Sequence, residues 1–267
     1  DAIAAGVRLG ADTALMDEAW WIPVYRLHTS GVTFGMFFER AFPGSIVVDR
    51  RGRRFMNEAA NYDAAGRAMA DAALAQGLDA PSFMVFDARY RSRYIAGPLK
   101  PSPPLADRLL RREVREMLFK APTLDALAAQ IGVDAAALRD TVERFNAFAR
   151  NGRDADFGRG EEPYERFFSD PRVGPNSTMA PITRAPFYAI AIHPGDIGTK
   201  GGLVTDRDGR VLDTRGAAIP GLYAVGNSAA SMMGRSYPGG GATIGPAMIF
   251  GARAAMHIAG KGLPPTE

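Results

Sequence analysis

The sequence predicts a mixed α/β (α+β) fold, because short apolar strands alternate with amphipathic helices over 267 residues. The apolar residues of 135–150 recur at spacings of three and four, which is typical of a helix with one buried face. Thirty Gly and 19 Pro indicate many turns and irregular connections between these elements. A chain of this length can bury a large core in one or two domains.

The first part of the chain predicts a short succession of helix and strand. Residues 1–20 begin as an amphipathic helix and continue into a strand at 13–16, and residues 20–23 mark a boundary. Residues 45–49 form an apolar strand ended by a turn. The Ala-rich residues 64–77 predict a helix closed by a C-terminal glycine.

The middle of the chain contains the clearest helices. A buried strand is expected at residues 83–87. Thr123 is placed to cap a helix over 124–131, and Asp134 to cap one over 135–150, since their side chains can accept from the first free backbone amides.

The last third changes character and becomes rich in glycine. Residues 158–181 are charged and turn-rich, which favours a surface excursion, and residues 195–202 read as a glycine-rich loop. A final helix is expected after Gly241, with Gly245 and Pro246 in its first turn. Short strands are expected at residues 187–192, 203–206, 210–212 and 221–226.

Composition excludes several classes of function. With no cysteine, the chain can form no disulfide, thiolate metal site or Cys nucleophile, and its three histidines lack metal-ligand spacing, so no metal is expected. The net charge of +3 comes without a basic run interleaved with aromatics, so no nucleic-acid partner is expected.

No targeting or membrane-spanning segment is visible in the sequence. The most apolar stretch, residues 242–259, is interrupted by Pro246, Arg253 and His257, which favours a core helix over a membrane span. Membrane association is therefore not indicated, and we expect a cytoplasmic protein.

Residues 236–251 carry the strongest chemical signal. Three glycines, Gly239 to Gly241, directly precede the final helix, so backbone amides can approach a ligand closely and the positive end of the helix dipole faces the same place. Tyr237 adds a phenol at the edge of this loop. Such a site suits a reaction that polarises a carbonyl group or places charge on a flavin.

Other signatures of nucleotide binding or hydrolysis are missing from the sequence. No G-x-G-x-x-G follows a strand, and neither a Walker A motif nor a G-x-S-x-G elbow occurs.

Four segments together carry a family resemblance. They are residues 186–189, residues 195–203, residues 221–227 and the Tyr-Pro-Gly-Gly-Gly-Ala-Thr run after Ser236. They resemble the C-terminal part of the 3-ketosteroid Δ1-dehydrogenases, within the fumarate reductase/succinate dehydrogenase flavoprotein group. Residues 52–62 and 154–160 resemble the substrate-covering domain of that family.

The resemblance implies a partial FAD-binding domain interrupted by a mixed α+β substrate-covering domain. The expected boundaries are 1–24 and 195–267 for the FAD-binding parts and 25–194 for the covering domain. An N-terminal dinucleotide-binding segment is expected upstream, because such folds place the pyrophosphate on a strand, glycine loop and helix that these residues do not contain.

The resemblance also implies the chemistry. FAD would remove two hydrogens from C1 and C2 of a 3-ketosteroid, a small apolar ketone. Tyr237 and the Gly241 amide would hold the C3 carbonyl oxygen, Tyr62 would abstract the C2 proton, and hydride from C1 would pass to flavin N5. A phenol with a pKa of about 10 needs neighbours that favour the phenolate, and the family supplies a further tyrosine from its upstream part.

The remaining candidate residues concern an apolar pocket wall and the contacts with the flavin. Trp20 and Trp21 are candidates either for the wall of an apolar pocket or for core packing. The expected flavin-binding residues are Gly201, Gly202, Gly226, Asn227, Ala242, Thr243, Ile244 and Gly245.

Three alternatives stay open. The chain can belong to another dehydrogenase or reductase of the same flavoprotein group, including a steroid 4-dehydrogenase. A dicarboxylate reductase is disfavoured, because its His-Gly-x-Asn-Arg carboxylate grip is replaced by Gly234-Arg-Ser-Tyr237. Without its nucleotide-binding unit, the chain can also be a non-catalytic fragment.

Overall fold

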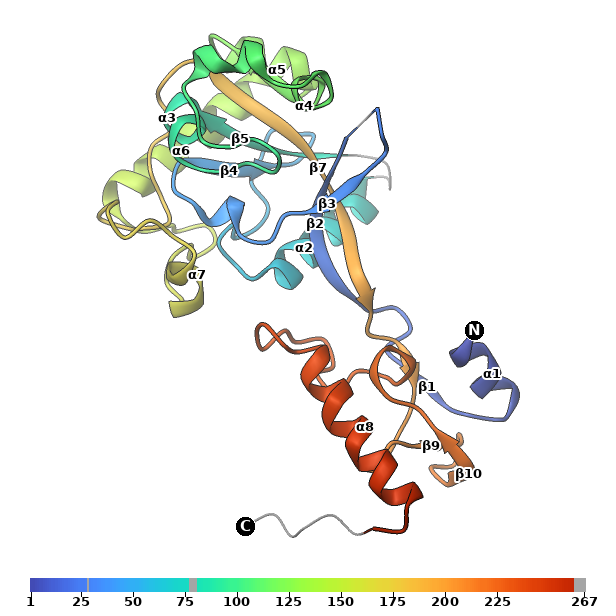
Figure 1. Ribbon diagram of the computed structural model, residues 1–267. Coiled ribbons are helices and arrows are strands. Elements are labelled where there is room, and N and C mark those ends of the chain that lie inside the picture. Colours follow the sequence, from blue (N-terminus) through green and yellow to red (C-terminus); the bar gives the residue numbers. More distant parts are fainter. Residues whose placement is uncertain (28, 77–80, 262–267) are drawn as a thin grey trace. The chain divides into compact units, whose positions relative to one another are not determined.

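The computed structural model describes residues 1–27, 29–76 and 81–261, which divide into two compact units (Figure 1). Residues 1–20 and those from Asp196 onward form the first unit, and Trp21–Gly195 form the second. The domain boundaries expected from the sequence, after residues 24 and 194, lie within a few residues of these divisions.

A six-stranded sheet organises the second unit. Its strands are hydrogen-bonded in the order β3-β2-β7-β5-β4, and β6 also pairs with β7. The strands are β2 (Ala19–Arg26), β3 (Thr33–Gly35), β4 (Ser45–Val48), β5 (Ser82–Asp87), β6 (Leu118–Ala121) and β7 (Phe187–Thr199).

One expectation for these strands was wrong, because the expected loop at 195–202 is strand as far as Thr199. The boundary expected at residues 20–23 contains the division between the units at Trp20 and Trp21, although β2 runs on through Pro23. The continuation of β7 depends on Gly195, where an added Cβ would lie 2.7 Å from the Val24 side chain of β2. The absence of a side chain therefore lets the two strands approach.

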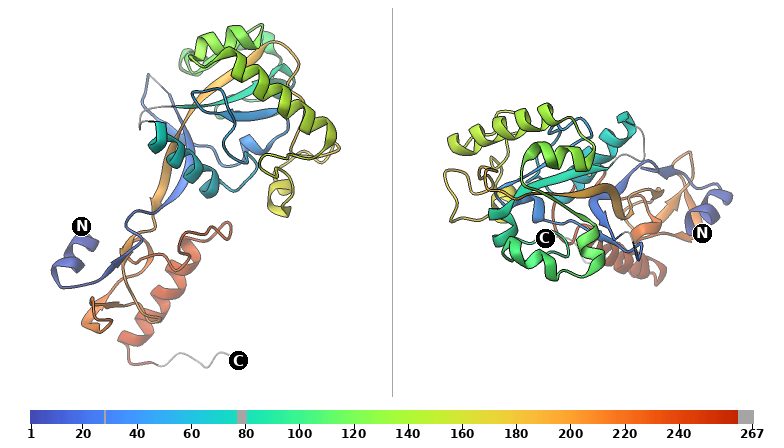
Figure 2. Two further views of the ribbon diagram at one scale, coloured as in Figure 1. Left: turned by 180° about the vertical axis from the view of Figure 1, so that it is seen from behind. Right: turned by 90° about the horizontal axis from the view of Figure 1, so that it is seen from above.

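Helices α5 (Leu124–Ile131) and α6 (Ala135–Asn151) cover one face of the sheet (Figures 1 and 2). Both expected caps are confirmed: Thr123 Oγ1 accepts from the Ala126 amide at 3.1 Å, and the Asp134 carboxylate accepts from the Ala137 amide at 2.7 Å. The covered face presents Ile46, Val48, Phe83, Val85 and Ala189.

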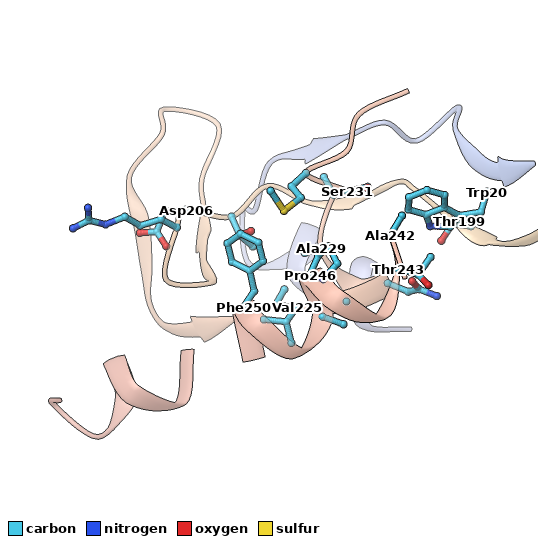
Figure 3. Close-up of a pocket in the computed structure, with 18 residues that line it drawn as sticks. Trp20, Thr199, Asp206, Val225, Ala229, Ser231, Ala242, Thr243, Pro246 and Phe250 are labelled. Carbon is cyan, nitrogen blue, oxygen red and sulfur yellow. The ribbon is translucent and has the colours of Figure 1, made fainter. Parts of the chain in front are cut away.

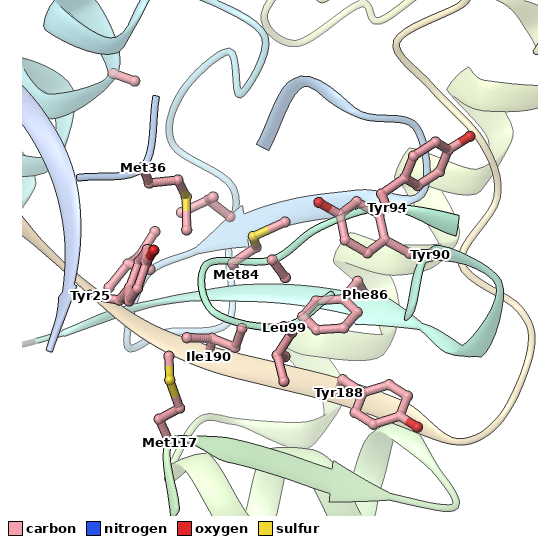
Figure 4. Packing of buried hydrophobic residues seen from close by; sticks show 14 of the residues in the cluster. Tyr25, Met36, Met84, Phe86, Tyr90, Tyr94, Leu99, Met117, Tyr188 and Ile190 are labelled. Atoms are coloured by element: carbon pink, nitrogen blue, oxygen red, sulfur yellow. The ribbon is translucent and has the colours of Figure 1, made fainter. Parts of the chain in front are cut away.

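The opposite face of the sheet packs against a second core, shown in Figure 4. Alternate strand residues such as Val47, Met84 and Ile190 point to this side, as the two-residue period of a strand requires. They meet residues from α2 (Tyr62–Gln76), α3 (Ala88–Arg93) and the loop around Leu99. The predicted C-cap at Gly77 lies outside the described residues. The remaining helices of this unit are η1 (Glu39–Ala41), η2 (Pro104–Leu109), α4 (Arg112–Glu116) and α7 (Pro163–Phe167).

The segment 158–181 is not a simple surface excursion. Arg159 and Thr178 have no exposed surface, and Glu165 and Asp170 are buried. The reason is a set of polar contacts to distant parts of the chain, described below, which the local charged sequence does not reveal.

The first unit is smaller and contains two antiparallel strand pairs. β1 (Thr13–Ala14) pairs with β8 (Gly202–Leu203), and β9 (Arg210–Leu212) pairs with β10 (Ala218–Tyr223). Their core includes Ala11, Leu203, Val211 and Ala224. The helices are α1 (Ala2–Arg8), η3 (Gly226–Ser228) and α8 (Ile244–Ile258).

The final helix, α8, begins as expected within the Gly-rich segment, with Gly245 and Pro246 in its first turn. None of the helices in the described part of the chain combines the length and the apolar character needed to cross a bilayer.

Candidate flavin and ketone site

A pocket of about 230 Å³ lies wholly within the first unit. Its walls come from the end of β7, the segment after β10, and the start of α8 (Figure 3). Most of the lining side chains are small or apolar, with Asp206 at one end and Trp20 and Thr199 at the other. The other lining residues are Thr205, Arg207, Ala224, Val225, Gly226, Asn227, Ala229, Ala230, Ser231, Met232, Ala242, Thr243, Pro246, Ala247 and Phe250.

Four of the predicted flavin-binding residues line this pocket: Gly226, Asn227, Ala242 and Thr243. Gly226 has a φ of +60°, a conformation that favours glycine, and an added Cβ would reach only ordinary contact with Ala247, 3.5 Å away. The backbone conformation, more than the space, therefore calls for glycine here.

Two further predicted residues, Ile244 and Gly245, open α8 between the lining residues Thr243 and Pro246. Gly245 donates its amide to the carbonyl of Gly241 at 2.9 Å. The Ile244 side chain is 63% exposed. These two residues shape the start of the helix rather than the pocket wall.

The remaining pair, Gly201 and Gly202, is buried and does not line the pocket. A Cβ on Gly201 would lie 2.7 Å from the Leu15 carbonyl oxygen, and one on Gly202 would lie 2.4 Å from the Ala229 carbonyl carbon. Close packing of backbone against backbone thus explains both glycines. A role in flavin binding stays a prediction.

The predicted ketone-binding residues, Tyr237 and Gly241, lie in the loop that leads into α8. The Tyr237 ring meets the ring of Trp20 edge-on, with centroids 6.2 Å apart. Gly241 has a φ of +92° and nothing within 4 Å of the place where a Cβ would stand. Because Trp20 also lines the pocket, Tyr237 is connected to the pocket through this ring contact.

Tyr62, the predicted base, belongs to the second unit, whereas Tyr237 and Gly241 belong to the first. It is the first residue of α2 and is partly exposed. Its ring lies edge-on to that of Phe37, with centroids 5.4 Å apart. The Asn61 side chain accepts from the Ala64 amide at 2.8 Å, which caps the helix that Tyr62 begins.

Arg40 holds the backbone on both sides of the Tyr62 ring contact. Its fully buried guanidinium donates to the carbonyl of Phe37 at 2.8 Å and to that of Ala60 at 2.5 Å. Burial lowers the pKa of Arg40 to about 10, against the opposing effect of Glu39. The side chain therefore fastens the Phe37 loop to the residues that precede Tyr62.

A buried ionic network, formed by Arg54, Glu58, Asp154 and Arg159, supports this region. Glu58 accepts from Arg54 at 2.7 Å and from Arg159 at 3.0 Å, and Asp154 accepts from Arg54 at 2.7 Å. Burial alone would raise the pKa of the Glu58 carboxyl, but Arg54 and Arg159 outweigh it and hold that pKa below its usual value.

Arg159 extends the network to the backbone. It donates to the carbonyls of Ser45 at 2.8 Å, Arg40 at 3.1 Å and Phe42 at 3.2 Å. Arg40 in turn donates to the carbonyl of Ala60, so the network fixes the backbone just before Tyr62.

The size and lining of the first-unit pocket are compatible with one part of a flavin cofactor. The pocket volume is below the range of 300–1,000 Å³ usual for complete small-molecule sites, so it suits one part of a larger cofactor, such as a ring. Small residues and the start of α8, a helix of 15 residues, border the pocket. The positive end of the helix dipole favours negative charge on a bound group. In the described residues, no group of three His, Cys, Asp or Glu is placed to hold a metal.

Reasoning from the sequence missed Lys200, Arg40 and most of the residues that line the pocket after β10. Lys200 stands between the predicted glycines in the Gly-Thr-Lys-Gly-Gly run, so its place in that run was the available signal. The burial of Arg40 and Arg159 has no clear local signal, because it depends on partners such as Ala60, 20 residues from Arg40, and Arg40 itself, 119 residues from Arg159.

Comparison with known proteins places these features in a family. The chain is 46% identical over 263 residues to 3-oxosteroid 1-dehydrogenase of Mycobacterium tuberculosis, an alignment that covers 97% of this chain and 46% of the relative. It is 41% identical to 4-oxocyclohexanecarboxylate 2-dehydrogenase of Sinomonas cyclohexanicum, covering 98% of this chain and 45% of the relative. It therefore spans about half the length of the curated relatives that it matches.

The structure is also similar to a solved one. The crystal structure of 3-ketosteroid Δ1-dehydrogenase from Sterolibacterium denitrificans in complex with 1,4-androstadiene-3,17-dione matches with a TM-score of 0.90 and 44% identity, over 97% of this chain and 46% of that one. The model of the FAD binding domain family matches residues 1–244. The chain belongs to the FAD binding domain family.

Proposed function

We propose that this chain is part of an FAD-dependent oxidoreductase that dehydrogenates a 3-ketosteroid between C1 and C2. The observation that carries the proposal is the position of the Tyr237–Gly241 loop. The loop leads into the start of α8, and its Tyr237 ring contacts Trp20, which lines the pocket together with Gly226. The 46% identity to a 3-oxosteroid 1-dehydrogenase supports the choice of substrate.

The residues divide the chemistry between them. The Tyr237 hydroxyl and the Gly241 amide donate to the C3 carbonyl oxygen, which stabilises negative charge there and makes the C2 proton more acidic. Tyr62 takes that proton, and the electron pair of the C2–H bond becomes the second bond between C1 and C2. Bound FAD supplies the acceptor for the hydride that leaves C1.

Two features support a further segment that completes the flavin site. The chain spans about half of its relatives, and α8 exposes more than 60% of Ile244, Met248, Ile249 and Ile258. We expect a dinucleotide-binding segment to complete this domain and to hold the pyrophosphate. A cytoplasmic location also stays a prediction, which cell fractionation tests.

A smaller ring ketone is the second candidate substrate. The relative from Sinomonas cyclohexanicum is named for a 4-oxocyclohexanecarboxylate, and its identity to this chain, 41%, is close to that of the steroid enzyme. Both substrates are ketones on a six-membered ring, so the same carbonyl-binding pair serves either.

The test is anaerobic reduction of the FAD-loaded protein by three compounds: a 3-ketosteroid, the corresponding 3-hydroxysteroid and 4-oxocyclohexanecarboxylate. We expect the visible flavin absorbance to bleach rapidly with the ketosteroid alone, with a product that carries a C1–C2 double bond. Bleaching by the cyclohexane acid alone supports the second candidate. A product with a new double bond elsewhere indicates another dehydrogenase of the group. The protein tested includes the dinucleotide-binding segment, and failure of that protein to take up FAD would contradict the proposal.

A further inference from the structure

We propose that Lys200 is a positioning residue that sets the place of Tyr237. This inference rests on the proposed function, in which the Tyr237 hydroxyl binds the ketone oxygen. All the groups involved belong to the first unit.

Lys200 is a cation with no exposed surface. Its ammonium lies over the ring of Trp20, 4.5 Å from the centroid, and donates to the carbonyl oxygens of Arg235 and Ser236, each at 3.3 Å. Burying an ammonium is costly unless such contacts replace water. A methionine of similar length would avoid that cost. The role of the charge therefore lies in the groups that the ammonium contacts.

Two kinds of contact connect the Lys200 ammonium to Tyr237. The two carbonyls belong to the residues directly before Tyr237, and the Trp20 ring is the one that meets the Tyr237 ring edge-on. A single side chain therefore fixes both the backbone that leads into Tyr237 and the aromatic surface against which its ring rests.

The backbone of Lys200 strengthens the same connection. Its amide donates to the Glu18 carbonyl at 3.0 Å, and its carbonyl accepts from the Ser231 amide at 2.9 Å. After Tyr237, by contrast, Gly239 and Gly241 have positive φ angles and space around them. The loop is thus anchored just before the phenol and is conformationally permissive after it.

The anchoring predicts a specific consequence for ligand binding. If Lys200 acts through Tyr237, its loss weakens binding of a ligand that carries the ketone oxygen and spares a ligand that lacks it. A structural defect alone would weaken both ligands together.

The experiment is a double-mutant cycle with Lys200→Met and Tyr237→Phe in the FAD-loaded protein. Dissociation constants are measured by perturbation of the flavin spectrum for a steroid 1,4-dien-3-one, which has no further hydrogens to lose at C1–C2, and for its 3-deoxy counterpart. We expect each single variant to reduce the preference for the ketone about tenfold, and the double variant to reduce it no more than Tyr237→Phe alone.

The control is Arg215→Met, which removes an 85% exposed cation of the first unit outside the Tyr237 loop. We expect it to keep most of the ketone preference. If Lys200→Met fails to fold, Lys200→Gln, which has no charge and a shorter reach, takes its place in the cycle. Flavin content is measured for every variant.

The outcomes separate the inference from the proposed function. A Lys200 variant that keeps the ketone preference while Tyr237→Phe loses it overturns the inference alone, as do losses that multiply in the double variant. A Tyr237→Phe variant that keeps the preference overturns the proposed carbonyl contact, and the inference with it.

Discussion

Glu58→Gln should destabilise the second unit strongly, although it changes only one oxygen to an amide nitrogen. Glu58 has no exposed surface, and it accepts from Arg54, Arg159 and the Val47 amide. Arg54 keeps its bonds to Asp154 in the variant, but Arg159 loses its Glu58 ion pair and stays buried. Leaving a buried charge uncompensated costs about 3–5 kcal/mol, and we expect a loss of that order in the free energy of unfolding.

Urea unfolding measured by circular dichroism tests this expectation, provided that the dependence on urea is the same for both proteins. The matched control is Glu116→Gln, the same change in an exposed ion pair with Arg112, which should alter stability little. A loss below about 1 kcal/mol for Glu58→Gln would refute the reasoning, because that value is expected of a surface pair.

Two further predictions concern the support of Tyr62 and the response to acid. Gly66→Ala should lower stability by about 1–3 kcal/mol and slow the proton-abstraction step, because its Cβ would stand 2.4 Å from the Ile22 amide nitrogen and push α2 away. Gly251→Ala inside α8, with open space around it, should instead be neutral or stabilising, and equal urea midpoints for the two variants would contradict the steric argument. The lowered pKa of Glu58 contributes stability above its usual value of 4.5, and this contribution is lost as the pH falls through the folded-state pKa. Urea midpoints should therefore fall on acidification below pH 4.5, less steeply in Glu58→Gln; parallel pH profiles would argue against this linkage.

The elements that the sequence predicted well are those with local causes. The helices at 124–131 and 135–151 each directly follow a residue whose side chain accepts from an amide three positions later. Strands 45–48 and 82–87 are short apolar runs between turns, and their alternate residues face the two cores. Such features need no knowledge of the rest of the chain.

The elements that escaped prediction depend on contacts between distant segments. Arg54 and Asp154 are 100 residues apart, and Arg159 reaches Arg40 across 119, so the burial of residues 158–181 has no local signature. Gly66 and Gly195 look like ordinary breakers, yet each permits a close approach to β2. For the candidate site, the Tyr237 loop was visible in the sequence, whereas the contacts of Lys200 with its flanking carbonyls required the structure.

The central claim is that Tyr237 polarises the carbonyl group of a ring ketone. The most direct measurement is the rate at which a 3-ketosteroid bleaches the flavin in a single anaerobic turnover of wild type and Tyr237→Phe, at equal flavin content. Removal of one such donor typically slows a reaction by about 10²–10³-fold, and we predict a loss in this range with FAD still bound. A variant that bleaches at nearly the wild-type rate would contradict the claim.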